Sequence, residues 1–453
     1  MTGHPPSLPN PPNSRSPLKS HPPAVSAAKA WWTVFLLSAL YVFSFIDRLV
    51  LALLVAPLRS DLGLSDLQLG LLFGPAFGLF YAALGLPLAR LADRGNRRRL
   101  IMAGVLLWGV ATTASGFATT FAFLVSLRAG LAVGEAALTP ATYSLIGDLF
   151  PPHRRKWAAS LYTAFGQAGA YGGFIVGAAV LHVIDSATWT GMASGLKSWQ
   201  LLFFAVGIPS ISLGVVFACT TREPPRNLLH GQTAPRLREV LGYLKHNFRL
   251  YLGLFGGAGL LQAVSYSWSA WAPEYVRRQF SWPIQRAGLV FGLSGLLATA
   301  AGTVILPLIA RRLESTGRRD AVPLTSMAGV LGGSLCALAA VLQSSPPAFF
   351  ILLAMSLFCT AGATNSVIIS LQTLAPDRMR ATLAACVLLC ITLLGLCIGP
   401  PVTAWIATTL SPQGQGLGVA LGILTAGVMI PCTLLFSISR ASLQAQPSDG
   451  SPR

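Results

Sequence analysis

Residues 67–99 read LQLGLLFGPAFGLFYAALGLPLARLADRGNRRR. Residues 67–89 carry no charged side chain, whereas residues 90–99 hold five arginines and one aspartate. A charge-free apolar run of this length exceeds the roughly 18 to 20 residues that an α-helix needs to cross a bilayer. An apolar run that ends in a basic cluster is typical of a transmembrane helix leading into a cytoplasmic loop. This stretch therefore predicts an integral membrane protein.

The composition of the whole chain extends this prediction. Of the 453 residues, 53% are hydrophobic and only 10% are charged, against roughly 25% charged in soluble domains. The chain is therefore expected to be an all-α membrane protein with twelve transmembrane helices. The twelve expected spans are 31–56, 67–89, 100–118, 121–147, 157–182, 199–220, 250–272, 286–309, 321–343, 347–372, 381–408 and 415–438.

The positive charges predict the orientation. The formal net charge is +18, but the cations lie in short clusters between the spans, which disfavours a nucleic-acid partner and favours cytoplasmic loops facing anionic membrane lipids. With both termini cytoplasmic, few cations fall in outer loops: Arg59, Lys197, Arg277, Arg278 and Arg286. High Ala and Arg usage and short loops point to a bacterial inner membrane.

A weak internal repeat predicts the domain organisation. Residues 91–98 align with 312–319, and residues 152–156 align with 376–380. Each half holds six spans, so the repeats have the same orientation and form two six-helix bundles. The expected segments are a disordered cytoplasmic tail at 1–29, a bundle at 30–220, a basic linker at 221–249, a bundle at 250–439 and a cytoplasmic tail at 440–453.

Motifs for nucleotide hydrolysis and metal binding are missing from the sequence. There is no G-x-x-x-x-G-K-[ST], no H-E-x-x-H, no calcium loop, and the six histidines are scattered. The seven cysteines lie almost wholly inside the spans, as small packing residues do. We therefore expect no enzymatic activity, no cofactor, no metal and no disulfide, and a monomer that works by a gradient or by the concentration of its substrate.

Four charged residues fall within the expected spans: Asp47, Arg48, Arg128 and Glu135. Each would cost at least ~2.5 to 3.5 kcal/mol at the bilayer centre if it were unpaired, so they should face the protein interior. Arg128 and Glu135 are seven residues apart and about 10 Å apart along one helix face, so span 1 can supply a partner to each. The network is either a static lock or the site of proton coupling by Asp47 or Glu135.

The loop after the second span resembles the signature of the major facilitator superfamily, G-x-L-A-D-R-x-G-R-[KR]. It departs from the signature at Ala89 and Asn96, and its Gly-Asn pair predicts a tight turn that acts as a hinge, because both residues tolerate a positive φ angle. The resemblance implies that Asp93 caps the span starting near Ala381, and that an arginine of the loop pairs with Asp148. The implied gating residues are Asp93, Arg94, Arg97, Arg98 and Asp148.

Three shorter segments resemble the spinster subfamily: residues 45–48, residues 128–136 and residues 144–151. That subfamily includes transporters of sphingosine phosphate and lysophospholipids, some of them proton-coupled. The resemblance implies a secondary transporter that works by alternating access on an amphiphilic lysolipid. Anion and sugar-acid permeases also carry an Asp-Arg pair on the first span, so an organic anion permease remains an alternative, as does a multidrug efflux antiporter.

The expected substrate site lies between the two bundles, charged on one side and neutral on the other. In the C-terminal half the polar residues of the expected spans, such as Gln262, are neutral. Together with Trp268 and Trp271 they suggest that this side of the cavity is apolar or weakly polar. Gly169, Gly173 and Gly177 on span 5 form a flat stripe, for helix packing or for gating. The predicted substrate-binding residues are Arg48, Arg128, Tyr41, Phe45, Gln262, Tyr266 and Asn365.

Overall fold

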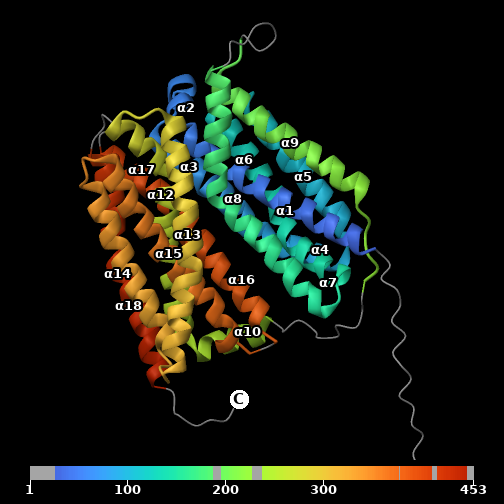
Figure 1. Ribbon diagram of the computed structural model, residues 1–453, viewed down its shortest axis with the longest axis vertical. Coiled ribbons are helices and arrows are strands. Elements are labelled where there is room, and N and C mark those ends of the chain that lie inside the picture. Colours follow the sequence, from blue (N-terminus) through green and yellow to red (C-terminus); the bar gives the residue numbers. More distant parts are fainter. Residues whose placement is uncertain (1–25, 187–194, 227–236, 377, 411–415, 446–453) are drawn as a thin grey trace, which may run out of the picture.

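The computed structural model describes residues 26–186, 195–226, 237–376, 378–410 and 416–445. Within these ranges the chain is helical and has no strand (Figure 1). The expected disordered tail lies outside the described residues up to residue 25, but helix α1 already begins at Ala27. Residues 227–236 of the expected linker and 446–453 of the expected second tail also lie outside them.

The six expected spans of the first half are present, each extended beyond its apolar run at one or both ends or divided in two. Their helices are α1 (Ala27–Leu49) with the 3-10 helix η1 (Val50–Leu53), α3 (Asp66–Phe73) with α4 (Pro75–Arg94), α5 (Arg97–Ser115), α6 (Phe121–Ala136) with α7 (Leu138–Leu149), α8 (Pro152–Ser186) and α9 (Ser198–Thr220). A short helix, α2 (Val55–Leu62), follows η1.

The second half repeats this order after a linker helix, α10 (Leu237–His246). Its helices are α11 (Phe248–Tyr251), the π-helix η3 (Leu252–Gly256) and α12 (Gly257–Phe280), then α13 (Ile284–Ser315), α14 (Ala321–Val341), α15 (Pro346–Leu374), α16 (Arg380–Cys390) with the π-helix η4 (Ile391–Leu396) and α17 (Gly399–Leu410), and α18 (Leu417–Gln444). Among the described residues, ten helical stretches are long and apolar enough to cross a membrane. The spans formed by α5 and by α11 to α12 complete the expected twelve.

Proline and close backbone approach explain where the spans break. The second span divides at Gly74, where Pro75 starts a new helix without a backbone N–H to donate. A Cβ atom on Gly74 would lie 2.3 Å from the carbonyl oxygen of Leu396 in the other bundle. The eleventh span changes from η4 to α17 just before Pro400 and Pro401, which cannot continue the preceding hydrogen-bond ladder. These breaks coincide with bundle-to-bundle contacts and were not expected from the apolar runs.

The glycine stripe of the fifth span packs against the first span. A Cβ atom on Gly169 would lie 3.0 Å from Cα of Val42, and one on Gly173 would lie 3.2 Å from Cα of Ile46. Helices α1 and α8 can approach this closely because the glycines present no side chain. The structure confirms the packing role of the stripe and leaves its gating role a prediction.

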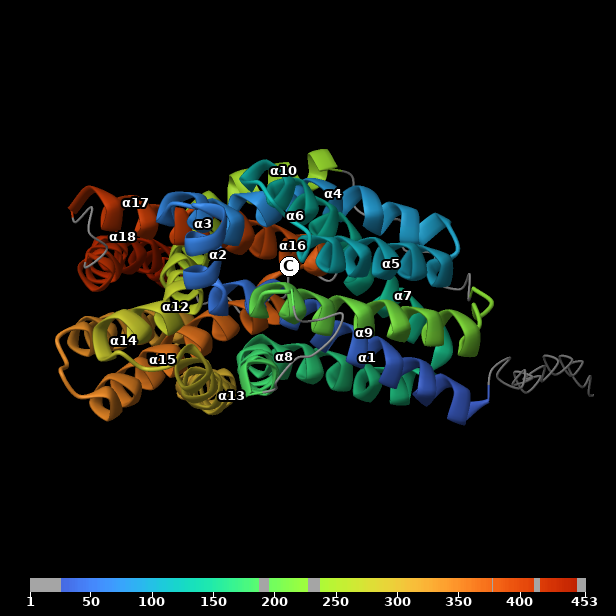
Figure 2. The ribbon, with the colours of Figure 1, turned by 90° about the horizontal axis from the view of Figure 1, so that it is seen from above.

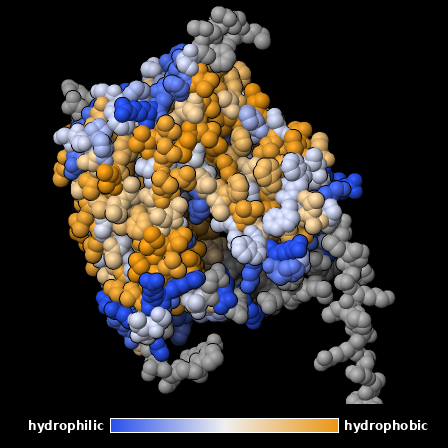
Figure 3. Space-filling model, in the orientation of Figure 1, coloured by the Kyte–Doolittle hydropathy of each residue, from blue (hydrophilic) through white to orange (hydrophobic). Residues whose placement is uncertain are grey.

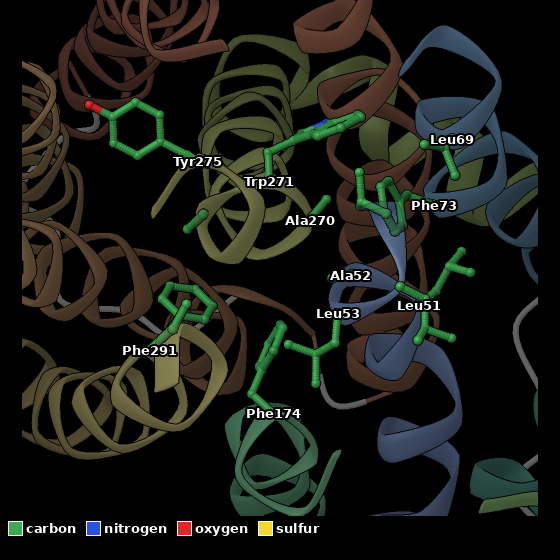
Figure 4. Close-up of a cluster of buried hydrophobic side chains, with 14 of the residues drawn as sticks. Leu51, Ala52, Leu53, Leu69, Phe73, Phe174, Ala270, Trp271, Tyr275 and Phe291 are labelled. Atoms are coloured by element: carbon green, nitrogen blue, oxygen red, sulfur yellow. The ribbon is translucent and has the colours of Figure 1, made fainter. Parts of the chain in front are cut away.

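The two bundles stand side by side and meet in one half of the molecule (Figures 1 and 2). We call the end that carries residues 90–99 the basic end. In the half away from it, Phe174 of α8 packs edge-on against Phe291 of α13 with ring centroids 4.9 Å apart. Phe73 of α3 packs in the same way against Trp271 of α12 at 5.3 Å (Figure 4). Towards the basic end the surface is hollowed between the bundles (Figure 3), so the molecule is closed at one end and open at the other.

Two glycines of the spans give a test of packing. A Cβ atom on Gly302 of α13 would lie 2.1 Å from the carbonyl oxygen of Phe358 in α15, whereas one on Gly85 of α4 meets nothing within 4 Å. Gly302→Ala should lower the free energy of unfolding by about 1 to 3 kcal/mol because a backbone atom cannot yield locally. Gly85→Ala should be neutral or stabilising. Thermal unfolding of the detergent-purified variants measures both, and equal melting temperatures would contradict the packing seen here.

Candidate functional site

The charges at membrane depth form two pairs in the N-terminal bundle. Arg48, at the end of α1, donates from Nη2 to Oε2 of Glu135, at the end of α6, over 2.5 Å. The Glu135 side chain is 1% exposed, and that of Arg48 is 15% exposed. An ion pair this deeply placed is strong only while both partners keep their charge. Protonation of Glu135 would therefore release the Arg48 guanidinium.

The second pair, Arg128 and Asp47, is joined through the backbone of Asp47 and not through its carboxylate. Arg128 donates from Nη1 to the backbone carbonyl of Asp47 over 3.2 Å, and the Asp47 carboxylate accepts from Ser210 at 3.5 Å, the long limit of a hydrogen bond. Asp47 is 0% exposed and Arg128 is 4% exposed. Arg128 is thus held within the bundle against the backbone of α1. This position conflicts with its expected role as a substrate anchor, which needs an accessible guanidinium.

The network keeps unused hydrogen-bonding capacity. Among the described residues, Nε of Arg48, Nη2 of Arg128, Oδ1 of Asp47 and Oε1 of Glu135 are buried without a hydrogen-bond partner. Buried polar atoms are rarely left without partners in a folded protein. The two cations and two carboxylates balance in formal charge, so a proton or an anion that enters the site changes its charge by a full unit.

Aromatic rings surround Arg48. Its guanidinium carbon lies 4.3 Å from the ring centroid of Phe77, 5.1 Å from that of Phe45 and 5.5 Å from that of Tyr81. Tyr41, one turn before Phe45, has its ring centroid 5.2 Å from that of Phe45 and stacks on Tyr162 of α8 at 4.5 Å. Rings over a guanidinium face stabilise its charge and leave the N–H edge free to bind. Phe45 therefore lies against Arg48, and Tyr41 lies against Phe45. Their substrate contacts stay predictions.

The C-terminal bundle contributes neutral polar groups. Gln262 of α12 accepts a hydrogen bond from Thr364 of α15 over 3.2 Å, and Tyr266, one turn after Gln262, packs against the apolar clusters of both bundles. Asn365 donates to the carbonyl of Thr303 over 2.7 Å. Its amide group thus joins α15 to α13, although the sequence predicted substrate binding.

The two tryptophans predicted to line the cavity are core residues. Trp268 is 1% exposed and Trp271 is 0% exposed. The indole N–H of Trp271 donates to the carbonyl of Pro400 over 3.1 Å. Both belong to the apolar contact between α12 and its neighbours, so the expectation of a tryptophan-lined cavity is wrong. A single sequence cannot tell an aromatic ring in a helix contact from one that faces a cavity.

The basic loop pairs as the family resemblance implied, in part. Arg97, the first residue of α5, forms an ion pair with Asp148 of α7 and donates from Nη1 to Oγ of Ser144 over 3.1 Å. Arg98 donates to the carbonyl of Ala218 at the end of α9. Arg97 is 1% exposed. The loop is therefore anchored to the N-terminal bundle.

The other half of the implied contact is missing in this structure. Asp93 is exposed and makes no hydrogen bond or ion pair within the described ranges. Arg94 is likewise exposed. Helix α16 begins at Arg380 without a side-chain cap. In the part of the chain that the structure describes, Asp93 therefore does not cap α16. The gating roles of Asp93 and Arg94 stay predictions.

The Gly95-Asn96 turn joins α4 to α5. Gly95 has φ −95° and Asn96 has φ −78°, so neither residue uses the left-handed region. Gly95 is needed for a close approach, because a Cβ atom there would lie 2.9 Å from the carbonyl oxygen of Leu91. Asn96 caps α5 by accepting from the backbone N–H of Arg99 over 2.8 Å. The turn therefore forms without the positive φ angle that both residues tolerate.

Sequence reasoning missed the residues that fasten this loop to the linker. Glu223, three residues after α9, accepts from Nε of Arg97 over 2.7 Å and from the backbone N–H of Arg98 over 2.8 Å. Arg226 donates to the carbonyls of Ala92 and Gly95. The sequence feature that could have indicated this contact is Glu223 itself, a carboxylate in a basic stretch directly after an apolar span.

The C-terminal half also joins the start of its third span to its last helix. Here the carboxylate lies at the start of the third span and the arginine lies on the last helix. Asp320, at the start of α14, accepts from Nε of Arg440 over 2.7 Å and from Gln444 over 2.8 Å, both near the end of α18. Burial alone would raise the pKa of Asp320, but the hydrogen bonds and positive charges of Arg440 and Arg318 outweigh it and hold that pKa below its usual value. In each half, the last helix is thus tied to the start of the third span.

Glu223→Gln tests the connection in the first half. Loss of this charge leaves the buried Arg97 with one carboxylate, so the free energy of unfolding should fall by about 1 to 2 kcal/mol. Glu239 is a matched control, since its side chain is 46% exposed and lies 4.0 Å from Arg378. Glu239→Gln should change stability by less than about 0.5 kcal/mol. Thermal unfolding separates the two, and the same melting temperature for both variants would show that Glu223 contributes nothing.

Comparison with known proteins accords with this geometry. Residues 37–400 match the family described as the Major Facilitator Superfamily. An MFS-type efflux pump of Mycolicibacterium smegmatis is 25% identical over 424 residues, which are 91% of this chain and 93% of the pump. A probable sulfoacetate transporter of Cupriavidus necator is 27% identical over 312 residues, 64% of this chain and 68% of that protein.

A solved structure shares the fold. The crystal structure of a bacterial homologue of the human lysosomal transporter Spinster, inward-facing and unoccupied, matches with a TM-score of 0.77 at 24% identity, over 92% of this chain and 97% of that one. The family match covers most of both bundles and the loop that carries the signature. The chain therefore belongs to the Major Facilitator Superfamily and is a transporter rather than an enzyme.

Proposed function

We propose that the chain is a proton-coupled secondary transporter that binds the anionic group of an organic substrate at Arg48. The observation that carries the proposal is the buried pair of Arg48 and Glu135, 2.5 Å apart beside three aromatic rings. The pair lies within the membrane-spanning helices. Ionisable residues are costly there, and those that occur mark the pathway of a substrate or a proton.

The charges give a simple coupling scheme. In the empty site Glu135 neutralises Arg48. When a proton binds Glu135, the guanidinium edge becomes free, and a carboxylate, sulfonate or phosphate group can take the place of the glutamate. One proton and one negative charge enter together, so the site keeps its formal charge. A site with a proton but no anion carries an unbalanced positive charge, and a site with an anion but no proton carries an unbalanced negative charge. Both states are unfavourable, so binding of the proton and binding of the anion are coupled.

The rest of the site favours an amphiphile as the substrate. The wall from the C-terminal bundle offers neutral groups on Gln262, Thr364 and Tyr266, and the wall around Arg48 is aromatic. A ligand with one anionic head and an apolar body matches both walls. A lysolipid with a phosphate head is our first choice, in keeping with the resemblance to the spinster subfamily.

A small organic acid is the second candidate. The relative named as a probable sulfoacetate transporter is 27% identical over 312 residues, and sulfoacetate is a short molecule with two acidic groups. Arg48 could hold one acid group and a neutral donor of the opposite wall the other. The similarity to a named efflux pump adds export of an amphiphilic drug as a third outcome to test.

We also propose that the basic end faces the cytoplasm of a bacterial inner membrane. The arginines of residues 90–99 lie at this end, and positive residues are retained on the cytoplasmic side. With this orientation the structure is open to the cytoplasm and closed to the outside. Asp93, Arg94 and the pair of Arg97 with Asp148 then act at the cytoplasmic gate.

A ligand screen followed by transport assays tests the function. Thermal shift of the purified protein against lysolipids, short sulfonates and sugar acids, and cationic drugs identifies the class that binds, since a ligand of the native state raises its apparent stability. The best ligand is then assayed in proteoliposomes with and without an imposed pH gradient. Stabilisation by cationic drugs alone, with no effect of any anion, would contradict an anion site at Arg48.

A further inference from the structure

Charged residues of both bundles form a chain at the end opposite the basic loop. Arg278 of α12 donates to both carboxylate oxygens of Asp66, the first residue of α3, over 3.2 Å each. Asp66 also pairs with Arg59 of α2, and Glu274 of α12 accepts from both Arg277 and Arg278. The bond between Asp66 and Arg278 is the member of this chain that joins the N-terminal bundle to the C-terminal bundle.

We propose that Asp66 and Arg278 form a reversible latch that holds the outer ends of the bundles together and thereby sets the balance between the two conformations of the transport cycle. The inference rests on the alternating access of the proposed function. It does not depend on which substrate is carried. The two residues are positioning residues, because they lie at the end of the molecule away from Arg48 and Glu135.

Burial strengthens the bond between Asp66 and Arg278. The side chains of Asp66 and Arg278 are 7% and 14% exposed, and Glu274 is 0% exposed. A doubly hydrogen-bonded ion pair shielded from water stabilises the joined state more than an exposed pair would. The shielding comes from close contact around it, since a Cβ atom on Gly70, one turn into α3, would lie 2.9 Å from Cα of Pro401 in α17.

The arrangement also makes the latch easy to open. Separation of a buried ion pair is costly when it leaves a charge without a counter-ion. Here, Asp66 retains Arg59 within its own bundle, and Glu274 stays between Arg277 and Arg278 on its own helix. Each side of the latch therefore has a counter-ion in both conformations. This is what a contact that must break in every cycle requires, whereas a permanent structural bridge would need only one partner on each side.

The adjacent residue Arg277 is a built-in control. Arg277 and Arg278 are neighbours on α12, and both bind Glu274. Of these two arginines, Arg278 is the one that the structure shows bonded to the other bundle, through Asp66. A substitution at Arg277 removes the same charge from the same end of the molecule and leaves the latch bond in place.

The test measures the separation of the outer ends directly. Spin labels are placed at Ser60 and Thr409, which are exposed near the outer ends of the N-terminal and C-terminal bundles, in a full-length variant whose seven cysteines are replaced. Double electron-electron resonance then gives the populations of short and long distances. Arg278→Gln and Asp66→Asn should each raise the ratio of outward-open to inward-open protein about tenfold, and the double variant should add little to either. Arg277→Gln should change this ratio less than twofold.

Conservative variants and thermal unfolding separate the latch from a structural role. Arg278→Lys keeps one charged bond to Asp66 and should restore most of the wild-type populations, whereas a bridge needed only for folding would show its loss as a lower melting temperature with unchanged populations. Equal shifts for Arg277→Gln and Arg278→Gln, or no shift for Arg278→Gln and Asp66→Asn, would overturn the latch alone. A single unchanging distance in every variant and at every pH would overturn the latch together with alternating access.

Discussion

Glu135→Gln is expected to abolish accumulation of substrate driven by a pH gradient while leaving exchange of substrate across the membrane measurable. Glu135 is 3% exposed, and the charged partner that the described residues give it is Arg48. A glutamine cannot release a proton, so the carrier can no longer return empty in the deprotonated form. Exchange survives because a loaded carrier can cycle in both directions without a coupling proton.

The experiment compares two assays on one preparation. Proteoliposomes with an imposed gradient report accumulation, and preloaded proteoliposomes without a gradient report exchange. Glu135→Asp keeps a titratable carboxylate and should retain accumulation at a reduced rate. Accumulation by Glu135→Gln at the wild-type level would show that the pair with Arg48 is a static lock.

Asp47→Asn decides between the two candidate carboxylates. Its carboxylate accepts a long hydrogen bond from Ser210, while Arg128 binds its backbone carbonyl. The Asp47 side chain therefore lacks a charged hydrogen-bond partner that a proton would displace, within the residues described. We expect Asp47→Asn to retain gradient-driven accumulation, which is the opposite of the result for Glu135→Gln.

The twelve helices were predictable from the sequence, but their breaks were not. A charge-free run of about 20 residues has essentially one stable form in a bilayer, because every backbone group must be bonded internally. The change to a π-helix at 252–256 depends instead on tertiary contact, since a Cβ atom on Gly253 would lie 2.4 Å from the carbonyl oxygen of Leu435. Such a contact leaves no periodic pattern in the sequence.

The charged residues of the site could be identified, but their partners could not. Adjacent residues on a helix diverge by about 100°, so the rotation of α1 decides whether Asp47 or Arg48 faces Glu135. That rotation is set by packing, with Val42 and Ile46 held against the glycines of α8. The same limit applies to Asn365, because its bond to the carbonyl of Thr303 depends on how α13 and α15 lie together.

Arg48→Lys is expected to weaken binding of anionic substrates about 100-fold while leaving a neutral analogue within about threefold. Lysine keeps the positive charge but loses the planar N–H edge that binds an acid group through two parallel hydrogen bonds. It also loses the planar surface that packs against Phe77, whose ring centroid lies 4.3 Å from the guanidinium carbon. Together these two losses amount to about 2 to 3 kcal/mol, which corresponds to roughly a hundredfold change in affinity.

The matched control is Arg128→Lys, which changes the same functional group within the same buried group of charges. Arg128 binds a backbone carbonyl of α1 and is 4% exposed, so its substitution should lower stability and affect both ligand classes alike. Titration calorimetry with the ligand found in the screen and with its neutral amide or ester separates the two variants. If Arg48→Lys weakens both ligands equally, Arg48 does not bind the acid group and its role is confined to its pair with Glu135. If Arg128→Lys alone discriminates between the two ligands, the acid group of the substrate is bound by Arg128.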